Sequence, residues 1–215
     1  MIKYLGMVLY LAIMVITVDS SYGQANADEA DVRKSFTGYK SSIMNGQGEE
    51  ALGWVDSNTL EYYSNMLELS ISADSATVNN LDLMDKLMVL TVRHRVPKEK
   101  VFSMSGNTFL IYAIDEGMVG KNSVMTLEIG EISVNGNSAQ GQVVNNGIAA
   151  PLYFEFNKES DGWKIDITSI FGPSSAALKE AIKNFGQTEN EFIFQTLEML
   201  TGKPLDQKIW HPLRK

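Results

Sequence analysis

Few side chains in this sequence have the chemistry of a general acid, a general base or a nucleophile. The chain holds two histidines, His94 and His211, and no cysteine. The lack of cysteine excludes a thiol nucleophile, a disulfide and a cysteine-ligated metal. Among the carboxylates, Asp166 stands out because it lies between Ile165 and Ile167 in an alternating apolar segment. A buried carboxylate can act as a general base, so Asp166 is the candidate catalytic residue.

The face on which Asp166 lies decides between two interpretations. If that face lines a pocket, Asp166 is a buried base with Arg93 or Tyr63 as its partner. If it faces solvent, the residue belongs to the outer polar face of a sheet, which is the commoner arrangement. Tyr153 and Glu155 on the preceding predicted strand present the same two alternatives. The candidate ligand-binding residues are therefore Tyr63, Arg93, Tyr153 and Asp166.

For three other groups of residues, the sequence allows a structural role as well as a functional one. The triplet Arg93-His94-Arg95 ends a predicted helix, where cations favour the helix dipole, so capping is its simpler role. Tyr62 and Tyr63 point about 100° apart on a helix and cannot both be core residues. One hydroxyl either reaches a pocket or lies at the rim of the core. The 11 methionines lie mostly on apolar helix faces, which predicts core filling, with a plastic binding groove as the alternative.

Absent motifs and the net charge narrow the classes of function. The sequence has no glycine-rich phosphate loop, no His-Glu-x-x-His, no Gly-x-Ser-x-Gly and no metal-spaced cluster of His, Asp and Glu. We therefore expect no cofactor and no metal. The formal net charge of −8 and the pI of about 4.8 disfavour nucleic acid and anionic lipid as partners.

The N-terminal segment predicts export. Lys3 precedes an apolar run over residues 4–18, which is shorter than the roughly 20 residues of a membrane span. Small residues at Ser21 and Gly23 predict a signal peptide over residues 1–23, with a second cleavage option after Ala27. An uncleaved membrane anchor is the alternative. After cleavage we expect a soluble protein, with no membrane attachment, in the periplasm or the extracellular space.

Apolar spacings of three and four residues predict helices in the first half of the chain. They are expected over residues 32–45, 58–71, 80–92 and 97–104. Asn58 opens the second helix in a variant of the capping box. The third helix has an apolar side made of Leu81, Met84, Leu87, Met88 and Thr91. Val89, Leu90 and Val92 are apolar too, so we expect this helix to be buried in the core nearly all round. Residues 108–114 fit either a strand or a helix.

The clearest signal is a series of turn dipeptides in the second half. Asn135-Gly136, Asn146-Gly147 and Asp161-Gly162 are typical of tight hairpin turns. They separate predicted strands over residues 124–134, 138–144, 149–157 and 163–170, which indicates a four-stranded antiparallel meander. The apolar parity of the first strand switches at Gly130-Glu131, where the strand either carries a β-bulge or ends early. Two more helices are expected over residues 172–186 and 188–202.

The order of these elements resembles the nuclear transport factor 2-like family, also called SnoaL-like or cystatin-like. The resemblance covers residues 31–170 and includes the closing hairpin, residues 154–165, with its Trp-Lys-Ile strand. It implies a single α+β domain over residues 24–215, with a cone-like core that has a pocket at its wide end. Residues 171–215 would then be a helical extension. The family includes isomerases, dehydratases, small-molecule binders and proteins that only dimerise, so the fold does not decide the function.

The sequence favours a non-enzymatic, exported protein that binds a small apolar ligand or another protein through a pocket or a sheet face. The scarcity of catalytic side chains supports this prediction. One alternative is an isomerase or lyase with Asp166 as the base and Tyr63 or Arg93 as the electrophile. Another is an assembly module that forms a homodimer through its sheet face.

Overall fold

Helices precede and follow a four-stranded antiparallel sheet, so the fold is α+β as predicted. It is taken from a computed structural model that describes residues 20–213. The predicted signal peptide over residues 1–23 lies outside this range except for its last four residues, which begin the first helix. No helix within residues 20–213 has the length and apolar character needed to span a membrane.

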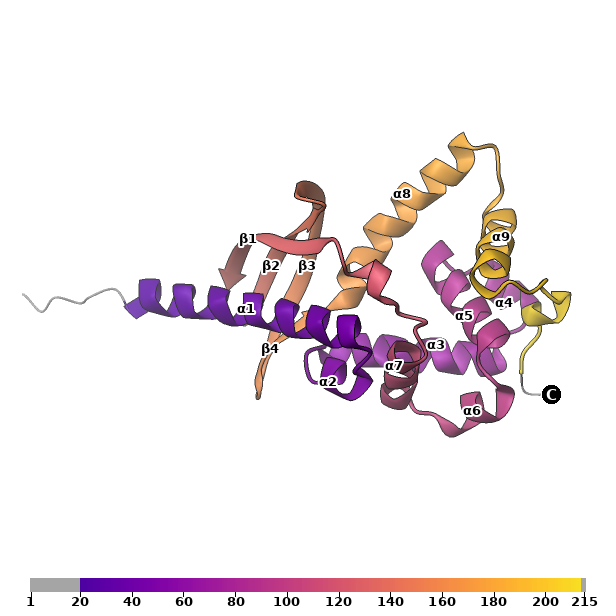
Figure 1. Cartoon of the computed structure of the whole chain (residues 1–215), viewed down its shortest axis with the longest axis horizontal. Coiled ribbons are helices and arrows are strands. Elements are labelled where there is room, and N and C mark those ends of the chain that lie inside the picture. Colours follow the sequence, from indigo (N-terminus) through magenta and orange to yellow (C-terminus); the bar gives the residue numbers. More distant parts are fainter. Residues whose placement is uncertain (1–19, 214–215) are drawn as a thin grey trace, which may run out of the picture.

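The elements follow one another along the chain as Figure 1 shows. Before the sheet come α1 (Ser20–Asn45), α2 (Gly48–Leu52), α3 (Ser57–Ser72), α4 (Ser75–Asn79), α5 (Leu83–Arg95), α6 (Lys98–Ser103), α7 (Gly106–Asp115) and the 3-10 turn η1 (Lys121–Ser123). The strands are β1 (Leu127–Asn135), β2 (Ser138–Asn145), β3 (Ile148–Glu159) and β4 (Gly162–Asp166). After them come η2 (Ile167–Ile170), α8 (Phe171–Asn184), α9 (Glu189–Thr201) and η3 (Gln207–Trp210).

The sheet is the predicted meander, with strand order β1-β2-β3-β4. Its second turn has Asn146 at φ 51° and Gly147 at φ 75°, the left-handed pair that a two-residue hairpin turn requires. The pairing of β1 with β2 slips between Ile129 and Ile132. The sequence allowed two alternatives at this point, a β-bulge or an early end of the strand. The structure has the bulge.

α1 crosses the apolar face of the sheet (Figure 1). Its predicted apolar stripe, Val32, Phe36, Tyr39 and Ile43, is buried. The ring of Phe36 lies 5.9 Å from that of Phe154 on β3. The spacing in the sequence therefore predicted the inward face of this helix correctly.

Part of each edge of the sheet is covered. At the β1 edge, Arg33 of α1 donates to the carbonyls of Ile129 and Gly130, at 2.7 and 3.0 Å, and Lys40 donates to that of Leu127 at 2.6 Å. At the β4 edge, the segment after α2 forms a parallel bridge in which Ile165 donates to the Trp54 carbonyl at 2.9 Å. The covered parts of these edges do not offer a free ladder to another chain.

Several helix boundaries differ from the sequence-based ones because side chains cap the helices elsewhere. α3 starts at Ser57 rather than Asn58, since the buried carboxylate of Asp56 accepts from the Thr59 amide at 2.9 Å. The predicted helix over residues 80–92 begins three residues later, at Leu83, and the short α4 precedes it. Residues 108–114 are helical, in α7, which a Ser105 capping box opens.

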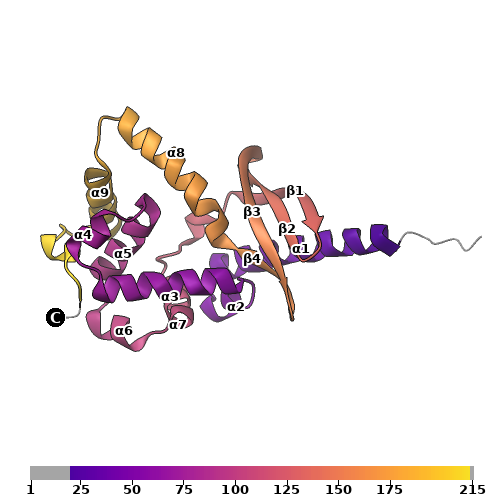
Figure 2. The same ribbon diagram turned by 180° about the vertical axis from the view of Figure 1, so that it is seen from behind.

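The buried apolar side chains form two clusters. The first joins the sheet to α1, α3 and α7 and includes Val32, Phe36, Tyr39, Tyr63, Leu67, Phe109, Phe154, Phe156, Trp163 and Ile165. The second joins α3, α4, α5, α8 and α9 and includes Met66, Val78, Leu83, Leu90, Ile182, Ile193, Leu197 and Ile209. α3 contributes to both, and Figure 2 shows it running from the sheet to the helical end of the molecule.

Candidate functional site

Asp166 ends strand β4 and caps the turn that follows. Its Oδ1 accepts from the amide and the hydroxyl of Thr168, at 2.8 and 2.6 Å, and Asn58 of α3 lies 3.5 Å from its Oδ2. The strand predicted to reach residue 170 therefore stops at Asp166, because this side chain and that of Ser169 turn the backbone into η2. Asp166 is 7% exposed, so it does not lie on an open surface. It is also not among the lining residues of the two pockets described below.

Arg93 is buried and caps a neighbouring helix rather than its own. Its guanidinium donates to the carbonyls of Leu69, Ser70 and Ala73 at the end of α3, and to that of Ile209 in the C-terminal segment. Burial lowers the pKa of Arg93 to about 10, so the side chain stays charged at neutral pH.

Arg93, one of the two predicted partners of Asp166, is placed apart from it. Asp166 contacts Asn58 at the start of α3, whereas Arg93 contacts Leu69 near its end. A helix rises about 1.5 Å per residue, so these two contact points are roughly 16 Å apart. The structure does not bring Asp166 and Arg93 together as the sequence-based hypothesis required.

The tyrosines named by the sequence lie in different surroundings. Tyr63 is buried against Phe109, with ring centroids 5.8 Å apart, while Tyr62 is half-buried and donates to Asp85 at 2.9 Å. Burial raises the pKa of both hydroxyls, so both stay protonated at neutral pH. Tyr153 is 48% exposed on β3. The expectation that Tyr62 and Tyr63 are not both core residues is confirmed.

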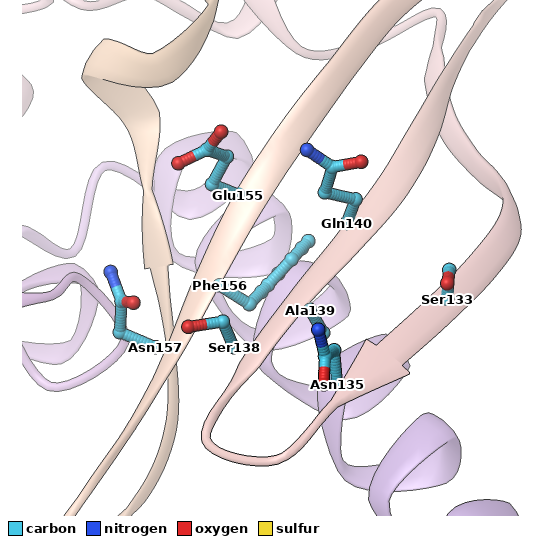
Figure 3. Close-up of a pocket in the computed structure, with 8 residues that line it drawn as sticks. All are labelled: Ser133, Asn135, Ser138, Ala139, Gln140, Glu155, Phe156 and Asn157. Carbon is cyan, nitrogen blue, oxygen red and sulfur yellow. The ribbon is translucent and has the colours of Figure 1, made fainter.

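A shallow polar hollow of about 320 Å³ lies on the sheet (Figure 3). Its lining comes from β1, β2 and β3 and consists of Ser133, Asn135, Ser138, Ala139, Gln140, Glu155, Phe156 and Asn157. Gln140 and Glu155 are paired across β2 and β3 and are both exposed. This places Glu155 on the outer polar face, one of the two alternatives drawn from the sequence. Because water reaches these side chains, the hollow gives a ligand little advantage over solvent.

An apolar pocket of about 190 Å³ lies between the helices, and we call it the methionine pocket. It is lined by Tyr63 of α3, by Met84, Leu87, Met88, Thr91 and Arg95 of α5, by Ala113 of α7, by Met118 and Val119 of the following loop and by Leu200 of α9. The five α5 residues follow helical spacing and share one face. Tyr63 is the one sequence-based candidate that lines this pocket.

One wall of the methionine pocket is the face of α5 that was predicted from the sequence to lie in the core. Met84, Leu87, Met88 and Thr91 are only half-buried, whereas Leu83, Val89, Leu90 and Val92 on the remaining surface of α5 are fully buried. The expectation that this helix is buried nearly all round is therefore wrong on the side of Met84, Leu87, Met88 and Thr91, which forms a pocket wall. One feature of the sequence pointed to a pocket wall rather than the core. The apolar stripe from Met84 to Thr91 is followed one turn later, on the same face, by the cation Arg95.

Two cationic side chains, Arg95 in the lining of the methionine pocket and Lys203, affect the protonation of His94. His94 lies beside Arg95 on α5, and its ring Nε2 is 3.0 Å from the hydroxyl of Thr201. Partial burial lowers the pKa of His94, and the charges of Lys203 and Arg95 lower it further, against an opposing effect of Glu198. His94 is therefore neutral at neutral pH.

Within residues 20–213, no three His, Asp or Glu side chains are grouped closely enough to hold a metal ion.

No family model, no curated protein and no solved structure matches this chain. The resemblance to the nuclear transport factor 2-like family therefore stays a prediction. The two sites described above differ in their lining, which is mainly polar in the hollow on the sheet and mainly apolar in the methionine pocket.

Proposed function

We propose that the protein binds a small apolar ligand in the methionine pocket and has no catalytic role there. The observation that carries this proposal is the pocket itself, whose lining is apolar except for the side chains of Tyr63, Thr91 and Arg95. Apolar surface left in contact with water costs about 25 cal/mol per Å², so covering it with a ligand is favourable. The proposal keeps the sequence-based prediction that the protein acts outside the cytoplasm.

The size and the side chains of the methionine pocket suit a flexible chain. A cavity of about 150 Å³ holds a benzene-sized guest, so a pocket of about 190 Å³ suits an alkyl chain of roughly six to eight carbons. Met84, Met88 and Met118 provide part of the wall. Unbranched methionine side chains adapt to guests of different shape, which suits a binding surface better than a catalytic one.

The test is a titration of the protein with octan-1-ol, followed through methionine methyl groups labelled with carbon-13. We expect the NMR signals of Met84, Met88 and Met118 to shift together. Met125 and Met199, which are 50% and 79% exposed elsewhere, serve as internal controls and should not move. Shifts of equal size at all five methyl groups, or at none of them, would contradict the proposal.

Met84→Gln tests the same pocket by substitution. Met84 is not among the half-buried side chains that pack on either hydrophobic cluster. The change should therefore weaken octan-1-ol binding about fivefold, which corresponds to ~1 kcal/mol. It should change the free energy of unfolding by less than about 0.5 kcal/mol. Met199→Gln on the exposed surface of α9 is the matched control and should bind normally.

The contacts give no specific support to the two alternatives drawn from the sequence. Asp166 is engaged in capping η2 and lies away from Arg93, which disfavours it as the base of an isomerase or lyase. The exposed side chains that line the hollow on the sheet are polar, and a dimer interface usually has an apolar centre. Both alternatives stay predictions.

A further inference from the structure

Arg95 is the one charged side chain in the lining of the methionine pocket. It lies on the last turn of α5 and is half-buried, four residues beyond Thr91 on the same face of the helix. The alkyl part of an arginine readily packs along an apolar wall while its guanidinium stays at the mouth. A ligand that fills the pocket would thus have one end near a positive charge.

The guanidinium of Arg95 has no counter-ion in the part of the chain that the structure describes. The ion pairs found within residues 20–213 involve Lys86, Lys158, Lys164, Lys179 and Lys208. The neighbouring Arg93 differs, because main-chain carbonyls engage all its nitrogens. In a protein of formal net charge −8, an arginine beside a pocket and without a carboxylate partner is available to an anion.

Thr91 does not compete for the polar end of a ligand. Its hydroxyl already donates to the Leu87 carbonyl of its own helix at 2.6 Å. The Tyr63 ring belongs to the first hydrophobic cluster. Arg95 is therefore the side chain of this lining best placed to select between ligand head groups.

We infer that the ligand is an anionic amphiphile, with an alkyl chain of roughly six to eight carbons in the methionine pocket and a carboxylate on the Arg95 guanidinium. This inference rests on the proposed function and adds the chemical class of the ligand. A guanidinium can hold a carboxylate through two parallel hydrogen bonds, a geometry that an alcohol does not reproduce.

The test compares octanoate with octan-1-ol, which share a chain length and differ in charge. Dissociation constants are measured by calorimetry at low salt for the full chain, for Arg95→Gln and for Lys183→Gln. Lys183 is exposed on α8 and does not line the pocket, so its variant controls for the change in net charge. We expect octanoate to bind the unaltered chain about five- to tenfold more tightly than octan-1-ol.

Arg95→Gln should bring the ratio of the octan-1-ol and octanoate dissociation constants close to one, whereas Lys183→Gln should keep the preference for octanoate. High salt should reduce the preference in the unaltered chain, because ions screen a charge at the mouth of a pocket. If octan-1-ol binds and octanoate binds no better, or if Arg95→Gln keeps the preference, the inference is wrong while the proposed function stands. If neither compound binds, both are wrong.

Discussion

Arg93 links three segments of the chain through main-chain carbonyls. The donors on one guanidinium reach Leu69 and Ser70 of α3, its C-cap residue Ala73 and also Ile209. The last carbonyls of a helix have no partner within that helix, so a buried helix end needs donors from elsewhere. The sequence indicated a capping role for the triplet at residues 93–95, and the structure shows that Arg93 caps a different helix from the one that contains it.

Arg93→Met should lower the free energy of unfolding by about 3 kcal/mol or more, because it leaves several buried carbonyls unpaired. Arg93→Lys should recover little, since an ammonium group cannot reach the same set of acceptors. Urea denaturation measures both variants. Arg95→Met, on the same helix but without a main-chain partner, is the control and should change stability by less than about 0.5 kcal/mol. Equal losses at residues 93 and 95 would count against this role.

His94 should make the protein slightly less stable in mild acid. Its pKa in the folded state is lowered from 6.5, first by burial and then by Lys203 and Arg95. The unfolded chain therefore takes up the proton more readily, and stability falls as the pH drops through about 6.5. Above that range the residue has no such effect. The size is small because the ring is partly exposed.

Urea midpoints of the unaltered chain and of His94→Gln, measured at pH 8 and pH 5, isolate this contribution. The unaltered chain should lose more stability between the two pH values than His94→Gln does. An identical loss in both proteins would show that the ring is not responsible.

At the scale of the elements, α1 both packs on the sheet and covers the first part of its β1 edge. The inward stripe of α1 provides the packing, while Arg33 and Lys40 reach the carbonyls of Leu127, Ile129 and Gly130. The double variant Arg33→Ala/Lys40→Ala should keep the helix and expose this edge, which invites pairing with another chain. We expect light scattering to rise with protein concentration.

The control for this edge is Lys34→Ala/Lys183→Ala, which removes the same charge from two exposed positions. This control should stay monodisperse under the same conditions. If both double variants associate equally, net charge rather than edge coverage explains the effect.

Local chemistry explains which elements could be predicted from the sequence. The Asn-Gly and Asp-Gly turns and the parity switch at Gly130 each depend on neighbouring residues, and the structure has all of them. The extension of β4 to residue 170 was wrong because Asp166 forms a cap that alternation does not reveal. The methionine pocket escaped prediction because it depends on how α5 meets α3, α7 and α9, which are distant in sequence.

At the scale of the whole molecule, the two hydrophobic clusters should unfold as one unit. α3 places Tyr63 and Leu67 in the first cluster and Met66 in the second. A helix that packs on both sides cannot lose one cluster without exposing part of the other. Trp54 and Trp163 report on the first cluster and Trp210 on the second.

Fluorine-labelled tryptophan gives a separate NMR signal at each of these three positions. We expect all three signals to change at the same urea concentration. An earlier transition at Trp210 alone would show that the helical end unfolds independently of the sheet, as a separate cooperative unit.

The contacts of Arg93 also set an order of events during synthesis of the chain. Its partners on α3 leave the ribosome before it, whereas Ile209 follows it by 116 residues. At roughly 5 to 20 residues per second, that carbonyl arrives roughly 6 to 23 seconds after the guanidinium. During this interval α3 and α5 can associate through Leu69, Ser70 and Ala73, but the second cluster still lacks Ile209 and the helix α9. The nascent chain thus exposes an incomplete apolar surface for seconds, and this surface is where a chaperone would bind it.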